Sequence, residues 1–192
     1  NGLVGSEMCI RDSRYYISDI EYIIISSSGG GNDFGDLTQG SNSFIADRGG
    51  CAGSNDSTRG LIVGGRTPGD GGGRNTIDFV TMASTGDSSE FGQLVTGRTG
   101  VDGGMANGTR AIFAGGYNQS TDPAIFFSII DTVNVQSKGE ATKFGELTTL
   151  RARLANTSNS IRGLISGGRS PSPSNPTNIC LLYTSDAADD LV

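Results

Sequence analysis

The chain repeats one short motif three times at nearly constant spacing. In each copy an arginine opens an apolar run that ends in two adjacent glycines, and the pairs lie 51 and 52 residues apart (positions 64, 115 and 167). The glycines are Gly64, Gly65, Gly115, Gly116, Gly167 and Gly168, and the arginines are Arg59, Arg110 and Arg162. A period near 50 residues indicates a supersecondary unit that stacks on its neighbours. The chain is therefore expected to fold as an array of similar units.

Three further features recur in the same order around this motif. The first alternates apolar and polar residues, as in Ile77–Val80 and Ile130–Val133, and the second is a Phe-Gly-x-Leu box headed by Phe34, Phe91 and Phe144. The third is an arginine before small residues, at Arg48, Arg98 and Arg151 or Arg153. Alternation with a period of two is typical of strands, and glycine permits tight turns. The sequence predicts an all-β fold with about four short strands per repeat.

The composition narrows the chemistry that the chain can perform. It holds 31 glycines but no histidine and no tryptophan, and it lacks a long apolar run that could cross a membrane. Without histidine, Ser-His-Asp and Cys-His catalytic arrangements and histidine-ligated zinc sites are excluded. We expect no catalytic residue, no metal ligand, no cofactor and no enzyme activity.

The two ends of the chain share an unusual relation at the DNA level. Residues 8–13 can be encoded by ATG TGT ATA AGA GAC AGn and residues 180–185 by TGT CTC TTA TAC ACA TCT, which are reverse complements apart from their edges. Both strings resemble translated transposase-library adapter, so residues 1–13 and 180–192 are expected to be adapter-derived, with the gene continuing beyond both, as in a metagenomic fragment.

Setting the ends aside changes the charge and the cysteine count. The chain has 14 basic and 20 acidic residues; the ends hold one base and five acids, which leaves 13 against 15, or −2. One cysteine, Cys51, then remains, so no internal disulfide is expected. A nearly neutral chain has no electrostatic reason to bind nucleic acid, and neither a nucleic acid nor a membrane is an expected partner.

The ordered features together resemble the Kelch repeat, which forms blades of β-propellers. The chain departs from that family at the outer-strand tryptophan, where it has Phe34, Phe91 and Phe144. The resemblance is nearest to divergent blades of environmental and phage proteins. It implies a partial β-propeller of four-stranded blades: residues 14–47 as an outer half-blade, 48–97 and 98–150 as whole blades, and 151–179 as an inner half-blade. Propellers close with about 4–8 blades, so closure would need further blades, and an open arc is expected to aggregate.

Each repeated residue has an expected structural role. The glycine pairs permit positive φ, and the box phenylalanines would fill the space between neighbouring sheets. Arg59, Arg110 and Arg162 are expected to pair with Asp78, Asp131 or backbone carbonyls. The alternative is that these three arginines form an anion-binding ring, as in sialidase-like propellers.

Loops between the second and third strands of each blade are the expected binding surface. The candidate residues are Asp70, Arg74, Tyr117 and Asn118. We expect a soluble, non-catalytic interaction or structural protein, associated with a phage virion or tail fibre, that binds a protein or a glycan. The alternatives are a cellular Kelch adaptor for a protein partner and the propeller scaffold of an enzyme whose site lies elsewhere.

Overall fold

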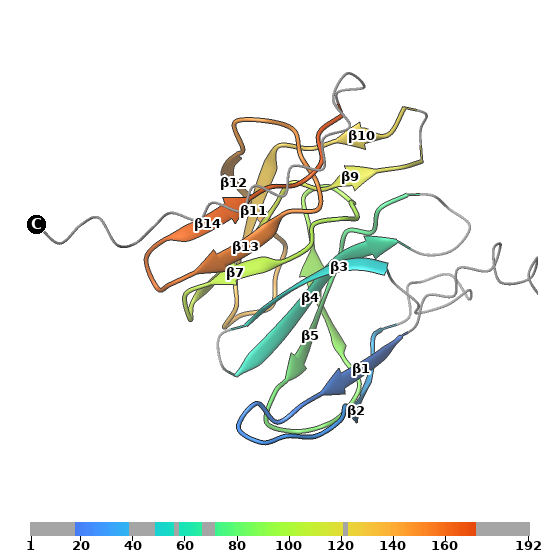
Figure 1. Cartoon of the computed structure of the whole chain (residues 1–192), viewed down its shortest axis with the longest axis vertical. Helices are drawn as coiled ribbons and strands as arrows, with labels where there is room; N and C mark the ends of the chain where they lie inside the picture. The colour runs from blue at the N-terminus through green and yellow to red at the C-terminus, as the bar shows by residue number, and fades with distance from the viewer. Residues whose placement is uncertain (1–17, 39–48, 56–57, 67–71, 121–122, 172–192) are drawn as a thin grey trace, which may run out of the picture.

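The chain is built from β-strands. The computed structural model describes residues 18–38, 49–55, 58–66, 72–120 and 123–171. Every regular secondary-structure element within these ranges is a β-strand (Figure 1). The predicted all-β class is confirmed. In this part of the chain no helix is long and apolar enough to cross a membrane.

The strands form two four-stranded antiparallel sheets and three two-stranded ones. The first sheet has the order β3 (Gly49–Asn55), β4 (Arg59–Arg66), β5 (Thr76–Thr81), β6 (Ser89–Gln93), and the second has the order β7 (Gly104–Ala106), β8 (Arg110–Ala114), β11 (Ile129–Asn134), β12 (Thr142–Glu146). The N-terminal hairpin is β1 (Asp19–Tyr22) with β2 (Asn32–Asp36), and the C-terminal hairpin is β13 (Ala155–Ser158) with β14 (Gly163–Ser166). A short hairpin of β9 (Tyr117–Asn118) and β10 (Ile125–Phe126) lies between β8 and β11 in the chain.

The sequence repeat is also a repeat of backbone conformation. The three glycine pairs have φ of 64° and 99°, 65° and 110°, and 62° and 97°, all in the left-handed region. The register of β5 shifts directly after Ile77, and that of β11 shifts directly after Ile130. In β1 the shift follows Ile20, the equivalent position of its repeat. Side chains with a Cβ rarely adopt such φ values, which explains why glycine occupies these positions.

Consecutive repeats are joined through the free edge of each outer strand. The N–H groups of Gly86 and Gly139 donate to the carbonyls of Phe34 and Phe91 at 2.6 and 3.1 Å. A second pair of bonds lies two residues further along: Ser88 to Asp36 at 2.8 Å and Ala141 to Gln93 at 2.8 Å. A Cβ at Gly92 would lie 2.1 Å from the Gly139 carbonyl oxygen, so the box glycine is required by close contact between backbones.

The largest hydrophobic core lies between the two four-stranded sheets. It contains Leu61, Val63, Ile77, Phe91, Leu94, Val101, Ala111, Phe113, Val133, Val135 and Ala141. Phe91 packs edge to face on Phe79 of the neighbouring strand, with ring centroids 6.0 Å apart, and belongs to this core. Phe34 is only partly buried, and Phe144 is exposed because no described strand covers that face of β12. The three box phenylalanines therefore differ in burial.

Charged groups in the interior pair differently from the expectation. Asp131 is fully buried and binds Arg98, also fully buried, at 2.8 Å; Arg110 is not its partner. Arg98 also donates to the Phe113 carbonyl at 3.3 Å. The pKa of Arg98 is lowered overall, because burial lowers it more than the nearby Asp131 carboxylate raises it. The reason for the different pairing is position: Arg98 precedes the inner strand and points into the sheet, whereas Arg110 begins β8 on an exposed end.

Asp78 and Arg59, which were also expected to form ion pairs or bind backbone carbonyls, make specific hydrogen bonds. Asp78 is fully buried and accepts a hydrogen bond from the Thr38 hydroxyl at 2.6 Å. Arg59 donates to the Val135 carbonyl at 2.9 Å and lies over the Phe79 ring. Arg59 therefore takes the backbone-carbonyl role, and it bridges the first sheet to the second.

Candidate binding site

The position directly after each glycine pair places three side chains at equivalent points of the repeat. These residues are Arg66, Tyr117 and Arg169, and each forms an isolated antiparallel bridge, with Gly73, Thr99 and Ala152 respectively. Tyr117 and Thr99 exchange two backbone hydrogen bonds of 2.9 Å, and Arg169 and Ala152 exchange bonds of 2.9 and 2.7 Å. In each repeat this residue therefore lies directly beyond the glycine turn, where the backbone makes a further antiparallel bridge.

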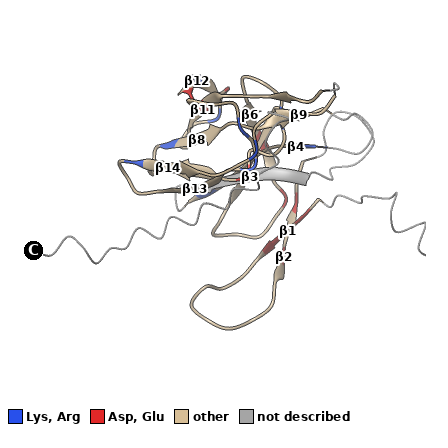
Figure 2. Ribbon diagram, turned by 45° about the horizontal axis from the view of Figure 1, so that its top comes forward, with Lys and Arg blue, Asp and Glu red and all other residues tan. Residues whose placement is uncertain are grey.

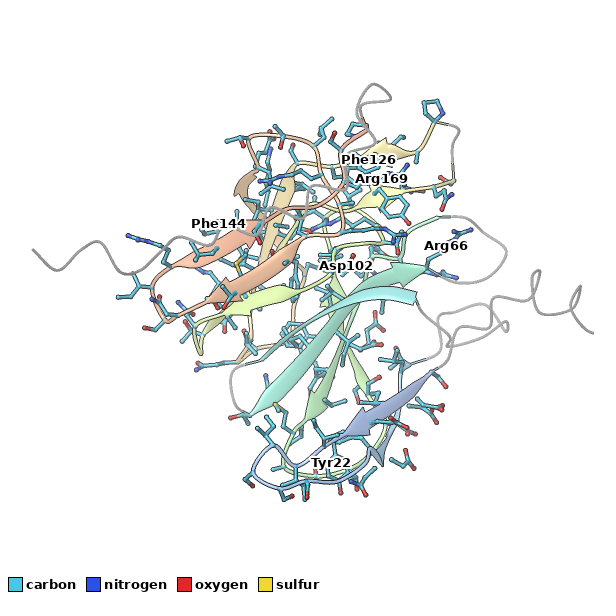
Figure 3. All side chains as sticks on the ribbon, in the orientation of Figure 1. Tyr22, Arg66, Asp102, Phe126, Phe144 and Arg169 are labelled. Atoms are coloured by element: carbon cyan, nitrogen blue, oxygen red, sulfur yellow. The ribbon has the colours of Figure 1, made fainter. Side chains whose placement is uncertain are left out.

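Four side chains at this end form a continuous stack. Tyr117 and Phe126 face each other across the β9–β10 hairpin with ring centroids 5.6 Å apart and an interplanar angle of 24°. The Arg153 guanidinium lies 6.0 Å from the Tyr117 centroid. The Arg169 guanidinium lies 5.7 Å from the Phe126 centroid, and these two side chains are labelled in Figure 3. We call these four residues the Arg–aromatic stack. Cation–π contacts of this kind contribute about 0.5–1 kcal/mol each at exposed sites.

Local backbone geometry holds Arg153 in this position. Its φ is 59°, which is unusual for a side chain with a Cβ, and its N–H donates to the Gly100 carbonyl at 2.8 Å. Gly100 has φ of 61°, and a Cβ there would lie 2.6 Å from the Tyr117 ring. The Arg153 side chain also donates to the Tyr117 hydroxyl at 3.4 Å, and this bond is the largest cause that raises the pKa of Arg153.

A single acidic side chain lies near the stack within the described residues. Asp102 has φ of 38° and is half-buried. Burial raises the pKa of its carboxyl, and the charge of Arg153 lowers it. Non-glycine residues with positive φ are uncommon, and their concentration at one place is typical of functional sites.

The sequence-predicted loop residues divide between this site and other positions. Tyr117 belongs to the stack, and the neighbouring Asn118 side chain accepts the Ser120 N–H at 2.8 Å. Arg74 is half-buried, and its N–H donates to the Gly65 carbonyl at 2.8 Å, so its backbone shapes the glycine turn. Asp70 lies outside the described residues.

The arginines that open the apolar runs do not belong to this cluster. Arg59 and Arg110 stand at the opposite ends of β4 and β8 from the glycine pairs, over the rings of Phe79 and Phe144. Arg162 precedes β14, where its N–H donates to the Asn159 side chain at 2.7 Å. The alternative of a ring of these three arginines is not supported by their contacts.

Four residues in the stack or near it are not predicted from the sequence. Arg66 and Arg169 directly follow the glycine pairs, so an alignment of the repeats shows both. Phe126 and Asp102 have no equivalent in the other repeats, so no repeat signal could reveal them. The sequence predicts Arg153 only as an alternative to Arg151 in the inner-strand position.

The stack presents two exposed guanidinium groups with restricted freedom. Arg153 and Arg169 are exposed, while the aromatic faces between them are covered by each other and by the two cations. Arg66 donates to the Gln119 side chain at 2.9 Å and adds a third guanidinium at the equivalent position of the preceding repeat. Planar, ordered guanidinium groups bind carboxylate and sulfate oxygens well.

Two other features are weaker candidates for a functional site than the Arg–aromatic stack. An apolar cleft of about 540 Å³ lies between the N-terminal hairpin and the first sheet, lined mainly by aliphatic and aromatic groups such as Tyr22, Phe34, Leu61 and Val80. No group of three Asp, Glu or Cys side chains that could hold a metal occurs among the described residues. The Arg–aromatic stack is thus the strongest candidate site.

No protein-family model matches this chain, and no curated protein is significantly similar to it.

Proposed function

We propose that this chain is a non-catalytic binding module made of Kelch-like propeller blades, and that the Arg–aromatic stack binds an acidic glycan. The observation that carries the proposal is the pair of exposed arginines, Arg153 and Arg169, each ordered by an aromatic ring. A phage virion or tail fibre is the setting that the resemblance implies for such a module.

The arrangement of the sheets supports the propeller part of the proposal. In both four-stranded sheets the strands lie in chain order, with the β9–β10 hairpin inserted between β8 and β11 of the second sheet. The inner strand β7 lies beside both β3 and β13. Four-stranded meanders with neighbouring inner strands are the pattern of propeller blades. The two hairpins would then be the outer half and the inner half of further blades.

The chemistry around the stack favours a polar, anionic ligand. Arg153 and Arg169 stand where the chain is rich in amides and hydroxyls, including Asn118, Gln119 and Ser120. A guanidinium already held by a ring loses little conformational freedom when it binds a carboxylate, which strengthens binding. Carboxylate or sulfate groups on a sugar supply the charge, and the surrounding polar groups can bind its hydroxyls.

Binding of the full chain to defined sugars tests the proposal. We expect 3′-sialyllactose or a sulfated oligosaccharide to bind and lactose not to bind in isothermal titration calorimetry. Arg153→Gln and Arg169→Gln should each weaken binding about 10-fold, since hydrogen bonds to charged groups contribute roughly 1.5–3 kcal/mol. Lys138→Gln, which removes one positive charge at the β11–β12 turn, is the matched control and should bind like the wild type.

Two outcomes would contradict the proposal. Equal affinity for lactose and for the acidic sugars would mean that charge is not recognised. Binding of an oligoglutamate peptide without any binding of acidic sugars would assign the site to a protein partner instead.

A further inference from the structure

The inner strand of the second repeat contains one residue more than the inner strands on either side of it. Arg98 precedes its glycine pair by 17 residues, whereas Arg48 and Arg151 precede theirs by 16. From the Thr99–Tyr117 bridge to the last pair of β7 with β8, the inner strand advances seven residues and its partner six. The first repeat and the C-terminal hairpin advance six residues on both strands. The extra residue makes a β-bulge, a feature that re-aims side chains and is frequent beside functional sites.

The bulge places Asp102 beside the Arg–aromatic stack. Gly100, Asp102 and Gly103 have φ of 61°, 38° and 121°, so the extra residue is accommodated in this turn. The Arg153 N–H donates to the Gly100 carbonyl at 2.8 Å, and the Asn156 side-chain amide donates to the Gly103 carbonyl at 2.8 Å. Both donors come from β13 or from the segment directly before it. The turn that carries Asp102 is therefore fixed against the segment that carries Arg153.

The Asp102 carboxylate has hydrogen-bonding capacity that the described chain does not use. Apart from its own N–H, no described residue donates a hydrogen bond to it. The carboxyl is half-buried, and its pKa is raised because burial outweighs the opposing charge of Arg153. A carboxylate with few donors costs stability, and so does a positive φ at a residue with a Cβ. A position that combines both costs is typical of a site that contacts a ligand.

Asp102 and Arg153 together offer an acceptor beside a donor. The guanidinium donates to the carboxylate or sulfate group of an anion, and the neighbouring carboxylate accepts from a hydroxyl group. The carboxylate repels an anion that has no hydroxyl to donate. An acidic sugar carries hydroxyl groups on the same ring as its charge, so it can satisfy both side chains at once.

We propose that Asp102 determines the specificity of the Arg–aromatic stack by accepting hydrogen bonds from hydroxyl groups close to the acidic group of the ligand. The inference rests on the proposed function and names what the same site selects. The preferred ligand is a hydroxyl-rich monoanion, such as a sugar with one carboxylate. An anion without hydroxyl groups gains the contact with Arg153 and loses affinity through repulsion from Asp102.

Two monoanions that differ in their hydroxyl groups test this role. Methyl β-D-glucuronide and cyclohexanecarboxylate both carry one carboxylate on a six-membered ring, and only the first has hydroxyl groups. Their affinities for the full chain at pH 7 are measured by NMR titration, following the amide signals of Gly100 and Arg153. We expect the wild type to bind the glucuronide more tightly than cyclohexanecarboxylate.

Removing the charge of Asp102 should reduce this preference. In Asp102→Asn the ratio of the two affinities should fall about 10-fold, because hydrogen bonds to charged groups are stronger than those to neutral ones. The loss of repulsion acts equally on both monoanions and cancels in the ratio. Asp102→Gly, which also tolerates the positive φ, removes the acceptor altogether and should lower the ratio at least as far. Glu90→Gln removes an exposed acid on β6, and it should keep the wild-type ratio as the matched control.

The outcome for Asp102 is separable from that for the proposed function. If Arg153→Gln weakens binding of both monoanions but the Asp102 variants keep the wild-type ratio, the specificity role is overturned and the binding site remains. If the wild type binds neither monoanion and does not bind 3′-sialyllactose, both proposals are overturned. Asp102→Asn is expected to be more stable than the wild type at pH 7, so a fall in its ratio reports a ligand contact and not unfolding.

Discussion

The arginines of this chain have different structural roles, which depend on the groups that contact them. Arg98 is fully buried and neutralised by Asp131, Arg59 ties two sheets together through the Val135 carbonyl, and Arg153 is exposed above a tyrosine ring. A buried pair contributes little net stability compared with apolar residues, but each member depends strongly on the other.

Removing one member of the buried pair should destabilise the fold. Asp131→Ala is expected to lower the free energy of unfolding by about 3–5 kcal/mol, because it leaves the Arg98 cation buried without a counter-charge. The double change Arg98→Met with Asp131→Leu should cost less than Asp131→Ala alone. Urea unfolding monitored by circular dichroism measures the free energy of unfolding of both variants. Glu146→Gln, which breaks the exposed pair of Lys143 and Glu146, should leave the midpoint unchanged. A double variant less stable than Asp131→Ala would contradict this account.

Asp102 should make stability depend on pH in an identifiable direction. Its carboxyl has a raised pKa in the folded chain, so the folded state holds the proton more tightly than the unfolded state does. Stability is therefore greatest below the unfolded pKa of about 3.9 and falls as pH rises through the folded pKa. Asp102→Asn removes the ionisable carboxyl and therefore the loss of stability at higher pH, and asparagine tolerates the positive φ at this position. We expect it to melt at a higher temperature than the wild type at pH 7 and at a similar temperature at pH 3. A lower melting temperature at pH 7 would show that the carboxylate is stabilising.

At the scale of the strands, the repeat works through backbone contacts between neighbouring units. The outer strand of one unit receives hydrogen bonds from the turn of the next, and the glycine of the Phe-Gly-x-Leu box allows the two backbones to touch. Gly92 packs against Gly139, while Gly35 packs against Gly86. The box is thus a connector between units as well as a part of its own sheet.

Adding one methyl group at this contact should separate the two sheets. Gly92→Ala would put a Cβ 2.1 Å from the Gly139 carbonyl oxygen, and the backbone shift that relieves it should cost about 1–3 kcal/mol. Gly139→Ala changes the other side of the same contact, where a Cβ meets nothing within 4 Å, and should be tolerated. Thermal unfolding of both variants measures the difference. Equal stability of the two would mean that the sheets can move apart without cost.

Across the whole molecule, charge is divided between the ends of the described chain. The N-terminal hairpin is wholly acidic and the C-terminal hairpin is wholly basic in their charged residues, although the chain between the expected adapter segments is nearly neutral. Figure 2 shows the acidic positions on β1 and β2 and basic positions beside β14.

The sequence by itself determined the period of the fold, its all-β class and the positions of the glycine turns, because these depend on residue type and spacing within one unit. Phe91 and Phe144 occupy identical boxes, yet one is buried and the other exposed. Arg98 and Asp131 are 33 residues apart, and only the sheet brings them together. The Arg–aromatic stack likewise joins three segments that are distant in the chain. Burial and pairing were decided by the tertiary structure, because they depend on which neighbour packs against a residue, and local sequence does not record that neighbour.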